Sequence, residues 1–369
     1  MSSEQIPFPR ILMGPGPMSV PARVVAAMGA APLGHLDPEL FAALTEIQEK
    51  LRPVFGTEND FTIALTGTGM AGMESCFANL IEPGDTAVIA VHGFFAERMC
   101  DLAGRFGANV VRVDSEWGQP SDPERVADAA AKAGRVKLVA CVHAETSTGV
   151  RQLLEPIAEI ARRYDALFLV DAVTSLGGLA VEIDRIGVDA GYSGSQKCMG
   201  SPAGLSPLTV SPRAMASAAS RKSKVPSYYY DWSELAKYWG EQRAYHHTVP
   251  ASNLLAFRES LRTIDEEGLP ARFARHQAMS DRLISGLSDI GIKPFAKEGN
   301  RLPTLNTVTI PDGVDDLAVR KRLLMEYGIE IGGGLGPLKG RIWRIGTMGD
   351  SAQPRNVDLL VAALKRILE

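Results

Sequence analysis

Short apolar runs rich in β-forming residues alternate with helix-like segments through the first two-thirds of this 369-residue chain. In one helix-like segment, residues 156–163, Ile157, Ile160 and Ala161 recur at helical spacing. This alternation predicts βαβ units, because parallel strands of one sheet need a crossover connection. We therefore expect an α/β fold with a mostly parallel sheet that helices cover on both faces. The apolar runs are residues 61–65, 86–91, 110–113, 136–142 and 166–170.

The pattern changes after about Pro250. Two long amphipathic helices, 253–267 and 269–287, precede a second alternation of strands and helices. At roughly 150 residues per domain, the length also suggests two domains. The Gly-Pro repeat at 14–17 is typical of a loop, so the N-terminus is expected to be an arm rather than a core element. We thus expect an N-terminal arm (1–20), a large domain (21–250) and a smaller α+β domain (251–369).

Charge and composition exclude several classes of function. The formal net charge of -4 argues against a nucleic-acid-binding protein, which normally carries a basic excess. No apolar run approaches the roughly 20 residues of a membrane-spanning helix, and the first residues lack the pattern of a secretion signal. The four cysteines form no C-x-x-C pair and the six histidines form no H-E-x-x-H motif, so we expect neither disulfides nor a metal site. These features favour a cytoplasmic protein.

A glycine-rich turn, residues 66–72, follows the first apolar run and precedes a helix-like segment. Glycines permit a tight turn, and the free N–H groups of a helix N-terminus bind anions such as phosphate. The same residues match G-x-G-x-x-G, so a dinucleotide-dependent oxidoreductase is one alternative. That fingerprint expects an acidic residue at the end of the next strand, where this chain has His92. A glycine turn without a ligand is the other alternative.

Three charged residues stand at unusual places in the pattern. Asp171 follows the apolar run 166–170, so it would reach the sheet edge where α/β proteins place their active sites. Lys197 lies in a glycine-rich segment with almost no other charge, where partial burial would lower its pKa toward that of a nucleophilic amine. Arg344 lies within a strand-like segment, where a fixed guanidinium could bind a carboxylate. The alternatives are that Asp171 is an aspartate satisfied within a turn and that Arg344 faces solvent on an edge strand.

A lysine, an aspartate and a phosphate cradle together suit pyridoxal phosphate (PLP). In this order of motifs the sequence resembles the alanine–glyoxylate / serine–pyruvate aminotransferases, the class V group of fold-type I PLP enzymes. The resemblance implies a mostly parallel sheet of the seven-stranded type, sandwiched by helices, plus a smaller C-terminal α+β domain. The matching segments are residues 14–17, 34–35, 66–69, 82–85, 143–150, 170–178, 192–197, 245–250, 332–337 and 344–346.

The resemblance also assigns roles around the cofactor. It implies that Lys197 binds PLP covalently as a Schiff base and that Asp171 pairs with the pyridine nitrogen. Thr146 takes a position near the ring hydroxyl and the substrate. The remaining cofactor contacts would be Thr68, Gly69, Met70 and Gln196 at the phosphate, with Phe95 on one face of the ring and Val173 on the other.

The resemblance also implies which residues contact the substrate and which contact the partner subunit. Arg344 would hold the substrate carboxylate, and Gly16 would leave room only for a small side chain. Tyr245 and Thr248 would reach the phosphate of the neighbouring subunit. The implied assembly is therefore a homodimer with shared active sites.

The activity that the resemblance implies is a ping-pong transfer of the amino group of alanine or serine to glyoxylate or pyruvate. The (S)-ureidoglycine–glyoxylate branch is an alternative, although its members carry an amide side chain at the position of Tyr245. A cysteine desulfurase-like lyase is less favoured. Such enzymes stack a histidine where this chain has Phe95, and they use a cysteine in a late mobile loop.

Overall fold

The computed structural model describes residues 10–369, so the first nine residues of the expected arm lie outside the described part. Its centre is a seven-stranded sheet in the order β2-β10-β9-β8-β5-β3-β4. All neighbouring strands run parallel except β10, which is antiparallel to both β2 and β9. The expectation of a mostly parallel α/β sheet is therefore confirmed. The strands are β2 (Phe61–Thr66), β3 (Thr86–Val91), β4 (Asn109–Asp114), β5 (Leu138–Val142), β8 (Leu167–Asp171), β9 (Ala190–Tyr192) and β10 (Leu205–Val210).

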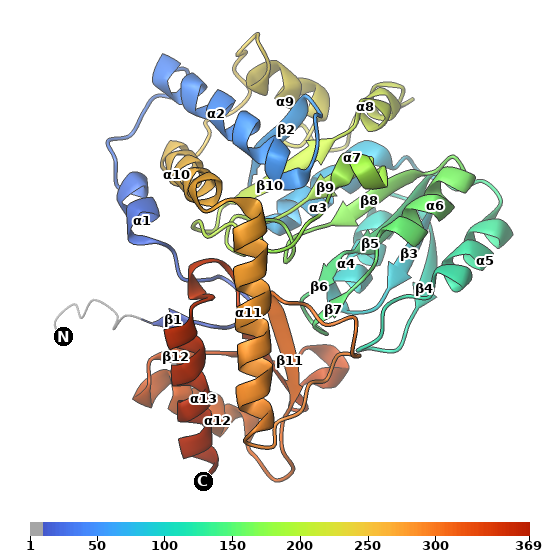
Figure 1. Cartoon of the computed structure of the whole chain (residues 1–369). Helices are drawn as coiled ribbons and strands as arrows, with labels where there is room; N and C mark the ends of the chain where they lie inside the picture. The colour runs from blue at the N-terminus through green and yellow to red at the C-terminus, as the bar shows by residue number, and fades with distance from the viewer. Residues whose placement is uncertain (1–9) are drawn as a thin grey trace, which may run out of the picture.

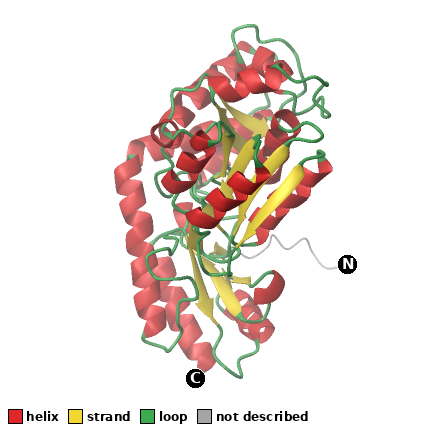
Figure 2. Ribbon diagram, turned by 90° about the vertical axis from the view of Figure 1, so that its right-hand side faces the viewer, coloured by secondary structure: helices red, strands yellow, loops and turns green. Residues whose placement is uncertain are grey.

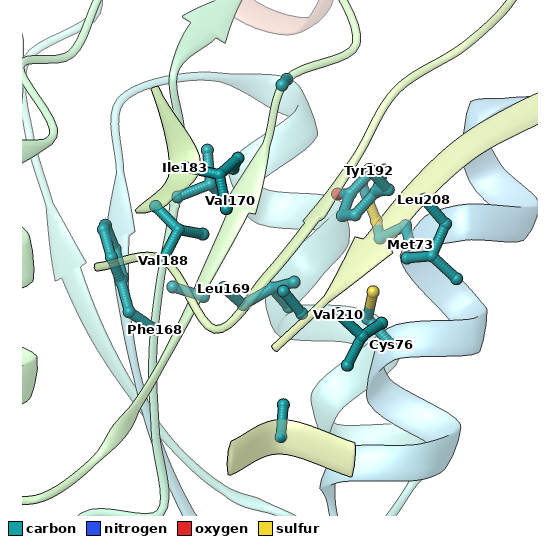
Figure 3. Close-up of a cluster of buried hydrophobic side chains, with 14 of the residues drawn as sticks. Met73, Cys76, Phe168, Leu169, Val170, Ile183, Val188, Tyr192, Leu208 and Val210 are labelled. Atoms are coloured by element: carbon teal, nitrogen blue, oxygen red, sulfur yellow. The ribbon is translucent and has the colours of Figure 1, made fainter. Parts of the chain in front are cut away.

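Helices cover both faces of this sheet (Figures 1 and 2). Central strands such as β5 and β8 are buried along their whole length, as expected for strands packed on both sides. Figure 3 shows part of this core, where Met73 and Cys76 of one helix lie against Leu208 and Val210 of β10. The helices are α2 (Pro38–Phe55), α3 (Gly69–Leu80), α4 (Phe94–Arg105), α5 (Pro123–Ala133), α6 (Glu155–Arg163), α7 (Ile183–Ile186), α8 (Pro212–Ala219) and α9 (Trp232–Trp239), with the hairpin β6 (Ala144–Glu145) and β7 (Val150–Arg151).

A second, smaller core lies around an antiparallel sheet of order β11-β14-β13. The long helix α11 (Leu269–Ser288) runs from the large sheet along this second unit (Figure 1). Leu283, Leu323, Trp343 and Leu360 are fully buried in its core. The other elements are β11 (Leu305–Thr309), α12 (Asp316–Glu326), β12 (Ile329–Glu330), β13 (Gly332–Gly333), β14 (Ile342–Gly346) and α13 (Pro354–Leu368), with short 3-10 turns at Gly336–Leu338 and Gly349–Ser351.

Part of the expected N-terminal arm is a core element, which corrects that expectation. Strand β1 (Ile11–Leu12) pairs in parallel with β12, and Met13 is fully buried in the smaller core. Pairing satisfies the backbone groups of this extended segment, so it packs instead of remaining a free arm. The segment then returns to the large unit, where the Met18 N–H donates to the Gln196 carbonyl at 3.1 Å.

The expected domain boundary at 250/251 does not match the packing. Helix α10 (Ala251–Glu267) packs on α1 (Ala22–Met28) and α2, and its Phe257 and Leu261 belong to the larger core. We propose that the smaller domain begins with α11, because α10 buries its apolar face in the larger one. Within residues 10–369, no helix is both long enough and apolar enough to cross a membrane.

Candidate active site

A cavity of about 130 Å³ lies at the carboxyl ends of the sheet strands, where β2, β5 and β8 end. All the site residues expected from the sequence line it except Gly16, Tyr245, Thr248 and Arg344. Parallel strands bring their carboxyl ends to one edge, so segments far apart in the sequence meet there. The lining residues are Thr68, Gly69, Met70, Met73, Phe95, Val142, Ala144, Thr146, Asp171, Val173, Gln196 and Lys197.

Asp171, the last residue of β8, is 2% exposed. Its Oδ2 accepts a hydrogen bond from Tyr192 Oη and its Oδ1 accepts one from the Val173 N–H, both at 2.8 Å. Burial raises the pKa of the carboxyl to about 7, although these two donors favour its charged form. The positive charge of Lys197 makes a smaller contribution in favour of the charged form, and a cationic ring nitrogen beside this carboxylate would add a further opposite charge.

Lys197 is 9% exposed, and burial lowers the pKa of its ammonium to about 8, with a smaller contribution from the positive charge of Arg344. Its Nζ donates to the carbonyl oxygen of Pro15 in the N-terminal segment. Gly16 lies directly against it: a Cβ at this position would lie 2.5 Å from Lys197 Nζ. Gly16 also has φ +104°, so both the space and the backbone require glycine here. The amine is therefore held at the cavity wall, with its pKa near neutral pH.

One end of the cavity carries donors for an anion. Helix α3 begins there, and its N-cap residue Thr68 makes no capping hydrogen bond with its side chain. Gln196 lies beside this helix end, and its side-chain Oε1 is buried without a hydrogen-bond partner. A Cβ on Gly194 would meet both groups, at 3.0 Å from Gln196 Oε1 and 3.5 Å from the Gly69 N. The free N–H groups and the dipole at this helix start fit a phosphate, to which the Gln196 amide would donate through its Nε2 because its Oε1 only accepts hydrogen bonds.

The walls of the cavity suit a planar ring. Phe95 and Val173 provide aromatic and aliphatic surfaces, and Thr146 provides a hydroxyl, which lies 2.5 Å from Thr174 Oγ1. Gly69 permits the close approach of Val173, since a Cβ there would lie 2.9 Å from Val173 Cγ2. The residues present thus fit PLP at each of its parts: phosphate, ring faces, ring nitrogen and aldehyde.

Arg344 lies in β14, the middle strand of the small sheet, and is 8% exposed. This excludes the alternative of a solvent-facing arginine on an edge strand. Its Nε donates to the Gly333 carbonyl at 2.6 Å, and none of the carboxylates in residues 10–369 forms an ion pair with it. Burial lowers its pKa to about 10, so the guanidinium stays charged at neutral pH. A buried cation without an ion-pair partner is suited to bind a carboxylate.

Tyr245 and Thr248 do not line the cavity. Tyr245 is 59% exposed and its ring contacts His35, with 5.0 Å between the ring centroids. Thr248 is exposed as well. Between them, His247 Nε2 lies 2.9 Å from Thr66 Oγ1, which anchors this segment to the end of β2 beside the phosphate cradle.

The sequence reasoning missed two buried residues of the site. Tyr192 donates to Asp171, and the sheet register does place Asp171 opposite Tyr192 on the neighbouring strand. Glu145 is fully buried and accepts hydrogen bonds from the first turn of α4. The pairing of the two strands that carry Asp171 and Tyr192 could have been inferred from their lengths. No local sequence pattern, however, connects Glu145 to a helix 50 residues away.

The fold and this cavity define a PLP-dependent aminotransferase of fold-type I. The sequence pattern of the family described as aminotransferase class-V matches residues 23–337. The chain therefore belongs to the aminotransferase class-V family, whose cofactor is PLP. This result places the glycine turn in a PLP enzyme rather than in a dinucleotide-dependent oxidoreductase.

Three relatives show how far the similarity extends. The crystal structure of an alanine–glyoxylate aminotransferase from Nostoc sp. has a TM-score of 0.97 and 47% identity, and the match covers 100% of this chain and 97% of that chain. The (S)-ureidoglycine–glyoxylate transaminase of Bacillus subtilis is 39% identical, over 97% of this chain and 90% of that protein. The alanine–glyoxylate aminotransferase of Drosophila melanogaster is 38% identical, over 98% of this chain and 92% of that protein.

Proposed function

We propose that this enzyme transfers the amino group of alanine or serine to glyoxylate or pyruvate in a ping-pong reaction. The observation that carries the proposal is one small cavity that brings together Lys197, Asp171 and a phosphate cradle. Relatives named alanine–glyoxylate aminotransferase, which match nearly the whole chain, support this choice of substrates.

The acid–base chemistry follows from the two shifted pKa values. PLP, when bound, accepts the electron pair released as the α-proton of the amino acid leaves. Asp171 holds a proton on the ring nitrogen, because its buried carboxylate gains a cationic partner there. Lys197 Nζ has a pKa of about 8, so a useful fraction is neutral at physiological pH and can accept the α-proton and return it.

The remaining residues bind and orient. The N–H groups at the start of α3 (Thr68, Gly69, Met70) and the amide of Gln196 hold the phosphate. Met70 contributes through its backbone, since its thioether has no proton to donate. Phe95, Val173 and Thr146 fix the ring, and Arg344 binds the substrate carboxylate. Gly16, packed against Lys197, keeps the substrate side chain small.

We further propose a cytoplasmic homodimer in which Tyr245 and Thr248 bind the phosphate in the partner subunit's site, with no nucleic-acid or membrane partner. Both residues are exposed, and they flank His247, which is held by Thr66 beside the phosphate cradle; this supports the shared site. The cytoplasmic location is supported by four buried cysteines, none of which forms a disulfide.

(S)-Ureidoglycine is the second candidate donor, because the Bacillus subtilis relative named for it matches nearly the whole chain at 39% identity. The two candidates are separated by steady-state rates for alanine, serine and (S)-ureidoglycine, each with glyoxylate and with pyruvate. Alanine or serine should give the highest kcat/KM. A kcat/KM for ureidoglycine more than about tenfold higher would reassign the donor and leave the reaction class unchanged.

A further inference from the structure

The start of helix α4 is capped by residues far away in the sequence. Its N-cap residue, Gly93, has no side chain, so the first N–H groups of the helix need other acceptors. The Phe94 N–H donates to Ser147 Oγ at 2.9 Å. The N–H groups of Phe95 and Ala96 donate to Glu145 Oε2 at 3.2 and 3.3 Å. Two residues of one loop thus replace the local cap.

The carboxylate of Glu145 is buried, and hydrogen bonds hold both of its oxygens in this position. It is fully buried, and its Oε1 accepts from Ser147 twice, from the N–H at 3.0 Å and from Oγ at 2.7 Å. Burial raises the pKa of its carboxyl, while these donors and the helix end favour the charged form. A local cap is excluded, since a Cβ on Gly93 would lie 2.4 Å from Glu145 Cγ. The cap therefore has a cost in burial that an ordinary serine cap would avoid.

The position of Thr146 connects this helix cap to the cofactor cavity. Thr146 lies between the two capping residues, and its side chain lines the cavity while theirs contact α4. Phe95, whose N–H is bound to Glu145, lines the same cavity. We propose that Glu145 is a positioning residue, whose carboxylate fixes the Phe95 ring and the Thr146 hydroxyl relative to each other around the cofactor. This inference rests on the proposed roles of Phe95 and Thr146.

Asp189 offers a matched control. Its buried carboxylate also accepts from a backbone N–H, that of Phe168 at 2.9 Å, and from a serine hydroxyl, that of Ser211 at 3.0 Å. Unlike Glu145, it also forms an ion pair with Arg213 at 2.8 Å. It does not line the cavity. Asp189→Asn and Glu145→Gln both replace an acceptor oxygen with an NH2 group that faces donors, and Asp189→Asn also breaks the ion pair with Arg213, so both should lower the Tm.

The experiment measures visible circular dichroism per bound PLP and the rate of PLP dissociation in the wild type and both variants. Glu145→Gln should lower the dichroic amplitude by about half or more and speed dissociation by about tenfold, which corresponds to about 1.4 kcal/mol. Asp189→Asn should change neither quantity despite its lower Tm. A full amplitude and an unchanged dissociation rate in Glu145→Gln would overturn the proposal.

A double-mutant cycle tests the route of the effect. If Glu145 acts through the Phe95 ring, Glu145→Gln should change the dichroism much less in a Phe95→Leu background. An undiminished effect there would show that Glu145 does not act through Phe95. Should Glu145→Gln fail to fold, Ser147→Ala removes the acceptor of the Phe94 N–H and should shift both readouts in the same direction by less; unchanged readouts would count against the proposal. A wild type that binds no PLP would instead refute the proposed function.

Discussion

Asp171 and Lys197 carry opposite charges, and burial moves the pKa values of both toward neutrality, to about 7 and about 8. Titratable groups displaced in this way are typical of active sites. The attraction between the two charges only partly offsets their burial, so both pKa values stay shifted until a ligand supplies further charge. This state has a measurable consequence for the protein without cofactor.

Asp171→Asn should stabilise the cofactor-free protein and weaken the binding of PLP. The amide oxygen can still accept from the Val173 N–H, and the NH2 group can donate to the Tyr192 hydroxyl, which also accepts hydrogen bonds. The ordinary pKa of the carboxyl is 3.8, and burial raises it to about 7. Its contribution to stability is therefore fully present below about pH 4 and is lost as the pH rises through 7. Asparagine stays neutral, so the gain in Tm should grow from pH 5 to pH 8. Thermal unfolding of the apoprotein at both pH values measures this, and a gain that does not grow would contradict the raised pKa.

Arg344→Lys should raise the KM for alanine about 10- to 100-fold and leave the affinity for PLP nearly unchanged. Lysine is a point charge and loses the two parallel hydrogen bonds to a carboxylate, and hydrogen bonds to charged groups contribute about 1.5–3 kcal/mol. Amines without a carboxylate serve as the control in the same rate measurement. An equal rise in KM for those amines would show that Arg344 does not recognise the substrate carboxylate.

At the scale of elements, a substitution at the start of α3 should affect cofactor binding and the stability of the apoprotein differently. Gly69 is the first helical residue, and an alanine there favours the helix by less than the roughly 1 kcal/mol that applies to a helix interior. Its Cβ would however lie 2.9 Å from Val173 Cγ2 and crowd the ring face. Gly69→Ala should therefore weaken PLP binding about tenfold or more without lowering the Tm of the apoprotein. Titration with PLP and apoprotein melting measure the two effects, and unchanged affinity would show that Val173 does not bound the ring.

The elements also show what sequence reasoning can reach. Asp171 and the start of α3 follow long apolar strands, and parallel strands bring such ends to one edge, so their meeting was predictable. The pairing of β1 with β12 was not, because two-residue strands carry no periodicity. The packing of α10 on the larger core also escaped prediction, since an amphipathic helix does not specify which neighbour covers its apolar face. The Glu145 cap joins distant segments and left no local signal.

At the scale of the molecule, the two units are joined next to the site. Thr304 Oγ1 donates to the Thr174 carbonyl at 2.9 Å, and Thr307 Oγ1 donates to the Thr148 carbonyl at 2.8 Å. Gly149 permits the second contact, since a Cβ there would lie 2.6 Å from Thr307 Oγ1. The loop that carries Thr146 is thus bound to the small unit. These contacts hold Arg344, which would bind the substrate, in a fixed position relative to the cofactor-binding residues of the large unit.

The proposed dimer predicts that two inactive variants restore activity when their subunits exchange. Lys197→Ala lacks the reactive amine, and Tyr245→Ala/Thr248→Ala lacks the proposed contacts to the partner's phosphate. In a mixed dimer one site collects every lesion, while the other has all three residues intact. Activity should then reach up to one working site per mixed dimer. Exchange is verified by mass first; exchanged dimers without activity would show that the two residues serve only their own subunit.

The central claim is that Lys197 and Asp171 form the centre of a PLP aminotransferase for small amino acids. It is tested most directly by adding L-alanine alone to the PLP-loaded protein and recording the visible spectrum and the keto acid released. The account predicts that the visible band bleaches with about one pyruvate formed per bound PLP, that glyoxylate restores the band, and that Lys197→Ala shows neither change. A visible band that persists with both alanine and serine, or a Lys197→Ala variant that turns over like the wild type, would contradict it.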